Sequence, residues 1–230
     1  MPSASGFLVE REVQTLQKLL KNPPKPFVAI LGGAKVSDKI DVLTNLSEKT
    51  DVIYIGGGMA YTFLKAQGRL IGKSILDAEK VDFARSLLQS SAKVHIPVDH
   101  VVSDQLEAGG QVQKTQGADI QDGWLGVDIG PKSVAELEKV LSQAKTIFWN
   151  GPLGVFENPE FSQGTLACAQ FVAKATRNGA FSVVGGGDSV SALKKSGCDK
   201  DVSHISTGGG ASLEFLEGKA LPGINVLPEA

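Results

Sequence analysis

Five short apolar runs recur along the chain, and each ends in small residues before a helix-like pattern begins. They lie at residues 27–31, 52–55, 146–149, 181–184 and 204–206. A short run of β-forming residues that is apolar throughout is typical of a parallel strand buried on both faces. The carboxyl ends of parallel strands share one edge of a sheet, so the five glycine-rich turns are predicted to meet there.

Helical periodicity fills the segments between these runs. The predicted helices span residues 7–20, 36–46, 59–67, 78–91, 133–142, 161–176 and 188–195, with a short helix from Ala211. Ser133 is the predicted N-cap of its helix, with Glu136 three residues on. Strand–helix units of this kind predict an α/β fold, a three-layer Rossmann-like parallel sheet with helices on both faces. We expect a single nucleotide-binding domain over residues 1–230.

The stretch between residues 93 and 129 departs from this alternation. Short strands are predicted at residues 93–96, 100–103 and 124–129. Residues 104–123 are polar, contain glycine and lack periodicity. Because a structureless loop of about twenty residues is unusual in a compact domain, we expect part of it to form a β-ribbon excursion.

Charge and composition narrow the classes of partner. The 230 residues carry 23 basic and 25 acidic side chains, a formal net charge of −2 without a long run of either sign. This balance argues against a nucleic-acid partner but is compatible with a small phosphate ligand. Neither a signal peptide nor a membrane-spanning stretch is evident, so no membrane partner is expected. Two cysteines are too few for a disulfide framework or a zinc site, which favours free thiols and a cytoplasmic location.

Several familiar motifs fail on inspection. Residues 68–74 (GRLIGKS) resemble a P-loop but have three residues between the glycines where four are required. The dinucleotide fingerprint G-x-G-x-x-G fails at Tyr61 and again at Val190, which disfavours a hydride-transfer enzyme. A G-x-S-x-G nucleophile elbow is absent from the sequence, and a structural role is expected for its three histidines.

The glycine turns and the lysines beside them favour an anion site. A helix that starts at such a turn points unpaired N–H groups and its positive dipole end at the edge of the sheet. Lys35 and Lys39 are predicted on one face of the helix after the first strand, where they favour phosphate contact. Asp188 either caps a helix or holds a divalent metal through water. Asn150 and Glu157 are uninformative by themselves.

Taken in order, these segments resemble the phosphoglycerate kinase family. The motifs are GGAKVSDK at 32–39, GGGMA at 56–60, WNGPLGVFE at 149–157, GGGD at 185–188 and STGGGAS at 206–212. The resemblance runs from Gly6 to about Gly223 and corresponds to the C-terminal, nucleotide-binding half of the family's enzyme. It implies that the N-terminal, phosphoglycerate-binding domain is absent and that residues 1–6 remain from the interdomain hinge.

The resemblance also implies roles for individual residues. Lys35, with Gly186 and Gly209, would act on the transferring phosphoryl group. Asp188 would hold Mg²⁺, and Glu157 would bind the ribose hydroxyls. The other implied phosphate contacts are Lys39, Asn150, Gly187, Thr207, Gly208 and Ser189, the last at a position where many members have threonine. The implied adenine slot is lined by Gly33, Ala34, Gly57, Gly58, Gly126, Val127, Pro152 and Val155, with Ile75 at its edge.

The implied chemistry is reversible phosphoryl transfer between 1,3-bisphosphoglycerate and Mg-ADP. Such transfer depends on in-line positioning and charge neutralisation, and a two-domain enzyme closes a hinge to achieve it. We therefore expect this chain to bind ADP or ATP and to show negligible kinase turnover alone. A non-catalytic nucleotide-binding module is the alternative, and a dehydrogenase-like domain is a weaker one.

Overall fold

The structure is a computed structural model that describes residues 4–90, 93–107 and 109–226. Residues 1–3 of the expected hinge segment and Ser91, the expected end of a helix, lie outside the described residues. Among the helices of the described part, none combines the length and the apolar character needed to cross a bilayer.

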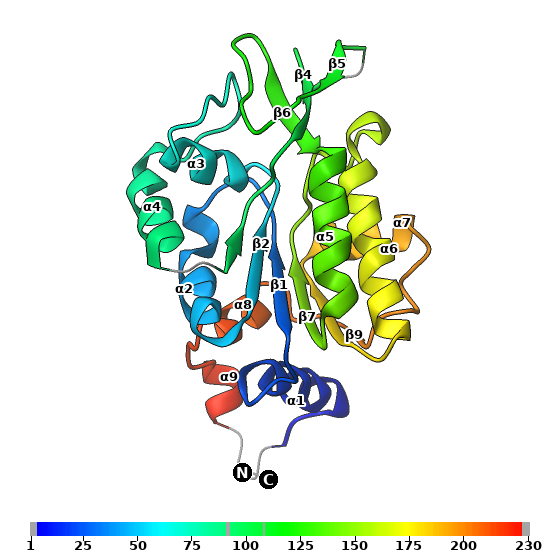
Figure 1. Cartoon of the computed structure of the whole chain (residues 1–230). Helices are drawn as coiled ribbons and strands as arrows, with labels where there is room; N and C mark the ends of the chain where they lie inside the picture. The colour runs from blue at the N-terminus through cyan, green and yellow to red at the C-terminus, as the bar shows by residue number, and fades with distance from the viewer. Residues whose placement is uncertain (1–3, 91–92, 108, 227–230) are drawn as a thin grey trace.

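The main sheet has six parallel strands (Figure 1). They are β1 (Phe27–Leu31), β2 (Val52–Ile55), β3 (Val94–His95), β7 (Thr146–Asn150), β8 (Phe181–Gly185) and β9 (His204–Ile205). Their order is β3-β2-β1-β7-β8-β9, so the direction of winding reverses between β1 and β7. In a doubly wound sheet, ligands bind beyond the carboxyl ends of the strands beside such a reversal.

Helices cover both faces of this sheet, which confirms the predicted three layers (Figure 1). One face carries α1 (Phe7–Leu20), α2 (Ile40–Lys49), α3 (Met59–Ala66), α4 (Val81–Ser90) and α8 (Gly210–Leu216), and the other carries α5 (Pro131–Gln143), α6 (Gln163–Arg177) and α7 (Gly187–Lys195). Alternate residues of β1 serve the two cores: Ala29 packs in the first and Ile30 in the second. Burial on both faces explains why the strand is apolar throughout.

A second, small sheet confirms the predicted excursion between residues 104 and 123. β4 (His100–Ser103) pairs antiparallel with both β5 (Val112–Lys114) and β6 (Leu125–Ile129). This sheet extends beyond the ends of α3 and α5 (Figure 1). It therefore places β6 near the carboxyl edge of the main sheet.

Two local predictions were wrong. The helix expected from Val36 is a 3-10 turn, η1 (Ser37–Lys39), followed by α2. Ser133 is not an N-cap, because α5 begins at Pro131, whose fixed φ suits the first helical position. The Asp99 carboxylate caps this helix instead, since it accepts hydrogen bonds from the backbone N–H groups of Lys132 and Ser133 at 3.0 and 2.8 Å. The other short helices are η2 (Ala78–Lys80), η3 (Pro159–Phe161) and α9 (Pro222–Asn225).

Candidate functional site

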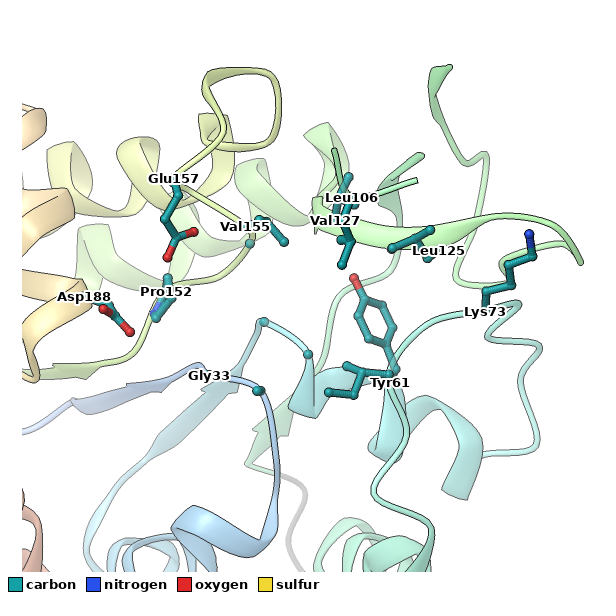
Figure 2. Close-up of a pocket in the computed structure, with 16 residues that line it drawn as sticks. Gly33, Tyr61, Lys73, Leu106, Leu125, Val127, Pro152, Val155, Glu157 and Asp188 are labelled. Carbon is teal, nitrogen blue, oxygen red and sulfur yellow. The ribbon is translucent and has the colours of Figure 1, made fainter. Parts of the chain in front are cut away.

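A cleft of about 460 Å³ opens at the carboxyl edge of the sheet, beside the reversal between β1 and β7 (Figure 2). The predicted site residues that line it are Gly33, Ala34, Gly57, Gly58, Ile75, Gly126, Val127, Pro152, Val155, Glu157 and Asp188. They come from the turns after β1, β2, β7 and β8, from the segment before α4 and from β6. The structure thus brings together the residues predicted for the base, the ribose and the metal.

Three glycine turns are hydrogen-bonded to one another and form the floor of the cleft. The Gly33 N–H donates to the Pro152 carbonyl at 3.2 Å, and the Gly57 N–H donates to the Leu153 carbonyl at 3.1 Å. Gly57 has a φ of 65°, and a Cβ there would lie 2.7 Å from the Gly33 nitrogen. A Cβ on Gly32 would overlap the Pro152 carbonyl. Glycine is required because the backbones of these turns touch.

The walls of the cleft include residues that the sequence analysis missed. They are Tyr61, Lys73, Leu106, Leu125 and Gly154. Tyr61 follows the Gly56–Gly58 turn by one helical turn, a spacing that could have identified it. Leu106 and Leu125 lie in the excursion and in β6, where no periodicity or motif marks a site.

Glu157 and Asp188 lie at the same end of the cleft (Figure 2). Asp188 is exposed in the first turn of α7. The described residues contain no group of three or more His, Cys, Asp or Glu side chains that could hold a metal ion by itself. A single accessible carboxylate fits Mg²⁺, which is commonly held by one or two carboxylates together with the phosphates of a substrate.

Lys39 and Asn150 form a buried polar pair beneath the floor. The Lys39 ammonium donates to the Asn150 carbonyl at 2.9 Å and also to the Asn150 side-chain oxygen. Burial lowers the pKa of Lys39 to about 8, and the nearby carboxylates of Asp38 and Asp188 oppose this shift. Ser189 is also buried, and its hydroxyl accepts a hydrogen bond from the Gly151 N–H at 2.6 Å. The described conformation thus engages all three polar groups within the protein.

Lys35 is exposed and lies before the first helical residue, so the prediction that it shares a helical face with Lys39 was wrong. The turn at Gly33 bonds to Pro152 and to Met59, and regular helical bonding starts only after it. Lys39 therefore points into the protein while Lys35 points to solvent. Their predicted phosphate contacts remain predictions.

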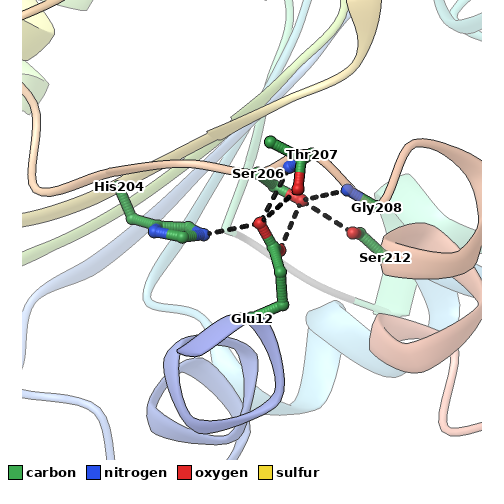
Figure 3. Close-up of polar contacts among 6 residues, drawn as sticks. All are labelled: Glu12, His204, Ser206, Thr207, Gly208 and Ser212. Carbon is green, nitrogen blue, oxygen red and sulfur yellow. Dashed lines mark hydrogen bonds and ion pairs between the residues drawn. The ribbon is translucent and has the colours of Figure 1, made fainter. Parts of the chain in front are cut away.

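The turn after β9 lies outside the cleft and contacts α1 (Figure 3). The Thr207 N–H and hydroxyl both donate to the Glu12 carboxylate, at 2.8 and 3.1 Å. Ser206 donates to the same carboxylate at 3.0 Å, and the His204 ring nitrogen lies 3.0 Å from it. Burial acts to raise the pKa of Glu12, but these hydrogen bonds and His204 outweigh it and lower that pKa. A carboxylate of the chain itself thus occupies donors predicted to hold phosphate.

The predicted catalytic glycines lie immediately before helices. Gly186 and Gly209 precede α7 and α8, with φ values of 88° and 54°. The N–H of Gly208, between Thr207 and Gly209, donates to the Ser206 hydroxyl at 3.4 Å. None of these glycines, nor Gly187, lines the cleft.

Fold and site together define a doubly wound α/β protein with a ligand cleft at its strand-order reversal. The family model for phosphoglycerate kinase matches residues 1–219. The chain therefore belongs to the phosphoglycerate kinase family.

Individual relatives agree with this assignment. The chain is 51% identical to a phosphoglycerate kinase of Acidobacterium capsulatum, over 99% of this chain and 57% of the relative. It is 52% identical to one of Mycolicibacterium smegmatis, over 99% of this chain and 56% of the relative. The solved phosphoglycerate kinase of Coxiella burnetii superimposes with a TM-score of 0.90 at 46% identity, covering 95% of this chain and 57% of that one. The chain thus spans a little over half the length of these relatives.

Proposed function

We propose that this chain is the C-terminal, adenine-nucleotide-binding half of a phosphoglycerate kinase. The observation that carries the proposal is the cleft, in which an apolar slot lies next to Glu157 and Asp188 at the reversal point of the sheet. An apolar slot suits a nucleotide base, and ligands of doubly wound folds bind at this edge. Family membership makes ADP and ATP the favoured ligands.

The arrangement supports a single orientation for the nucleotide. The base lies between Pro152, Val155 and Val127, and Glu157 takes the ribose hydroxyls. The phosphates extend toward Asp188, where the buried Lys39 ammonium supplies positive charge beneath them. Asp188 holds Mg²⁺, which neutralises charge on the phosphates when it is bound.

The whole enzyme's reaction would be phosphoryl transfer between 1,3-bisphosphoglycerate and ADP, a glycolytic step in the cytoplasm. Lys35 is proposed to meet the transferring group, together with the N–H groups of Gly186 and Gly209. Its exposed position supports this role, because the group must be reached from the acceptor side. Transfer also requires a second wall that binds phosphoglycerate, and we propose that the part of the family's enzyme that this chain does not span provides it.

The surface of α1 supports such a partner domain. Phe7 and Leu8 are 90% and 63% exposed. They adjoin a groove of about 500 Å³, which α1, α8 and α9 line with Leu16, Phe215 and Ile224 among others. Exposed apolar patches of this kind commonly mark an interaction surface. Without the domain that covers it, the chain would bind nucleotide and show negligible turnover.

Calorimetric titration with Mg-ADP and, separately, with NAD tests the nucleotide assignment. Saturable binding of ADP without NAD binding is expected. Binding of NAD with no response to ADP would contradict the proposal and support a dehydrogenase-like domain.

A coupled assay with ATP and 3-phosphoglycerate tests the second half of the proposal. The chain alone should give no turnover above background, and substantial turnover would contradict the claim that this half cannot transfer the phosphoryl group by itself. In the full-length enzyme, Lys35→Ala should abolish transfer while nucleotide binding persists. An unchanged rate would remove Lys35 from the transfer step.

A further inference from the structure

The turn that carries Lys35 receives its helix cap from a distant part of the chain. η1 starts two residues after Lys35, and the residue at its N-cap, Val36, is apolar and has no side-chain oxygen. The Asp77 carboxylate takes that place, because it accepts the Ser37 N–H at 2.9 Å from 40 residues further along the chain. A carboxylate at this end of a helix satisfies a free N–H group and suits the positive end of the helix dipole.

The side chain of Asp77 is directed away from the helix that it precedes. Asp77 occupies the N-cap of η2, a position where an aspartate commonly accepts hydrogen bonds from its own helix. Its side chain makes no such bond to the described residues of η2. The Asp77 backbone N–H donates to the hydroxyl of Thr62 in α3 at 3.1 Å, and Thr62 is 1% exposed. The residue that caps η1 is thus anchored on a buried side chain.

Residues 75–77 also connect this turn with the floor of the cleft. A Cβ on Gly58 would lie 2.7 Å from the Ile75 side chain and 2.9 Å from the Ala34 carbonyl, so these three residues pack together. Ala34 directly precedes Lys35. The turn is therefore held on both sides of Lys35, by the packed floor before it and by the carboxylate after it.

We propose that Asp77 is a positioning residue for phosphoryl transfer, which holds the Lys35 ammonium where the transferring group passes. This inference rests on the proposed function, because it takes Lys35 to meet that group. The Lys35 side chain is exposed, and no hydrogen bond or ion pair to the described residues holds it. Its position therefore depends on its backbone. Transfer is sensitive to such placement, since a shift of about 1 Å can cost about 100-fold in rate.

The hydrogen bond and the charge of Asp77 would act in different ways. A carboxylate repels a polyphosphate, so loss of the charge alone should leave ADP binding unchanged or strengthen it. Loss of the hydrogen bond frees the Ser37 N–H and lets the turn move, which slows transfer. Asp77→Asn separates the two effects, because an amide oxygen still accepts from an N–H group but carries no charge.

Kinetics of a whole phosphoglycerate kinase that contains this chain test the inference. Asp77→Ala should lower kcat with ATP and 3-phosphoglycerate by about 10- to 100-fold and leave the KM for ATP unchanged. Asp77→Asn should restore most of the wild-type kcat. Glu79→Ala is the matched control, because it removes an exposed carboxylate of η2 that has no hydrogen bond or ion pair among the described residues. This control should keep the wild-type kcat.

The chain alone provides a second readout, hydrogen exchange at the Ser37 amide. Protection of this amide should be lost in Asp77→Ala and kept in Asp77→Asn and Glu79→Ala. ADP binding, measured by calorimetry, should persist in all three variants. The stoichiometry of that titration counts the folded sites, so kcat can be expressed per site that binds nucleotide.

A merely structural aspartate would give a different pattern. An unchanged kcat per nucleotide site in Asp77→Ala would overturn the inference, whatever the variant's melting temperature. An equal loss of kcat in Asp77→Asn and Asp77→Ala would also overturn it, because the charge and not the hydrogen bond would then matter. Failure of the wild-type chain to bind ADP would instead overturn the proposed function.

Discussion

Two glycine-rich turns that follow parallel strands, at residues 32–33 and 207–210, differ in what surrounds them. The first bonds to the turns after β2 and β7 and helps to form the floor of an open cleft. The second lies against α1, where the Glu12 carboxylate accepts the Thr207 donors. Both turns have the composition of an anion site. Of the two turns in the described structure, only the first lines the cleft that Asp188 also lines.

The difference shows that a glycine turn at a strand end does not by itself leave its N–H groups free. Turns near the reversal of the sheet have neighbours on both sides, and their backbones pack together around a slot. At the outer strand β9, the same kind of turn meets a helix from the start of the chain. A single acidic residue on that helix, Glu12, then accepts the N–H and the hydroxyl of Thr207.

The packing of the first turn gives the largest expected effect. Gly32→Ala should lower the free energy of unfolding by ~3 kcal/mol, because the new Cβ overlaps the Pro152 carbonyl. In a chain of this size, that corresponds to a melting temperature lower by about 6–12 °C. The matched change at the second turn, Gly210→Ala, meets no atom within 4 Å and should stabilise by ~0.4–1 kcal/mol. Equal melting temperatures would refute the contrast.

Removal of the Glu12 carboxylate at the second turn should lower the free energy of unfolding by less than Gly32→Ala does. Glu12→Ala should lower the free energy of unfolding by about 1.5–3 kcal/mol, the range for hydrogen bonds to a charged group. Glu10→Ala, at an exposed position of the same helix, should cost almost nothing. ADP affinity should be unchanged in both variants. A lower ADP affinity in Glu12→Ala would show that the turn after β9 contributes to nucleotide binding at the cleft.

The Glu12 effect should depend on pH in a defined direction. The folded pKa of this carboxyl lies below its ordinary value of 4.5. Its stabilisation is therefore complete above pH 4.5 and is lost as the pH falls through the folded pKa. Urea unfolding of wild type and Glu12→Ala should converge in that acidic range, and a constant difference would contradict the assignment.

The effect expected from Lys39 is smaller than these changes in stability and concerns the affinity of the cleft for ADP. Its pKa of about 8 means that the ammonium loses its proton as the pH rises from 7 to 9. If that charge attracts the phosphates, ADP affinity should fall by up to about tenfold over this range. Lys39→Met should bind ADP more weakly than wild type, with an affinity that does not change with pH. Lys35→Met should keep the wild-type pH dependence of ADP affinity, because Lys35 is exposed. A flat wild-type profile would exclude Lys39 from phosphate binding.

Much of the fold could be predicted because its signals are local. Strands buried on both faces are apolar throughout, and the turns that touch one another need glycine, so β1, β2, β7 and β8 were identified correctly. The predicted start of α5 was two residues too late, because the cap is supplied by Asp99, which is far away in the sequence.

The cleft was less accessible to sequence reasoning because its walls come from distant segments. Tyr61 and Leu106 reach it from α3 and from the excursion, and only the folded chain brings them together. The family resemblance supplied most of the residues that line the cleft, among them Gly33, Gly126 and Val155. It did not indicate that Lys39, Asn150 and Ser189 would be engaged within the protein, or that Glu12 would accept the Thr207 donors.

Amide NMR shift mapping with Mg-ADP tests most directly where the chain binds nucleotide. We expect the largest changes at residues of the cleft, among them Gly33, Gly58, Gly126 and Val155. The amide of Thr207 should respond weakly, because its N–H remains on Glu12. Changes confined to residues 207–210, or no changes at saturating ADP, would contradict the account.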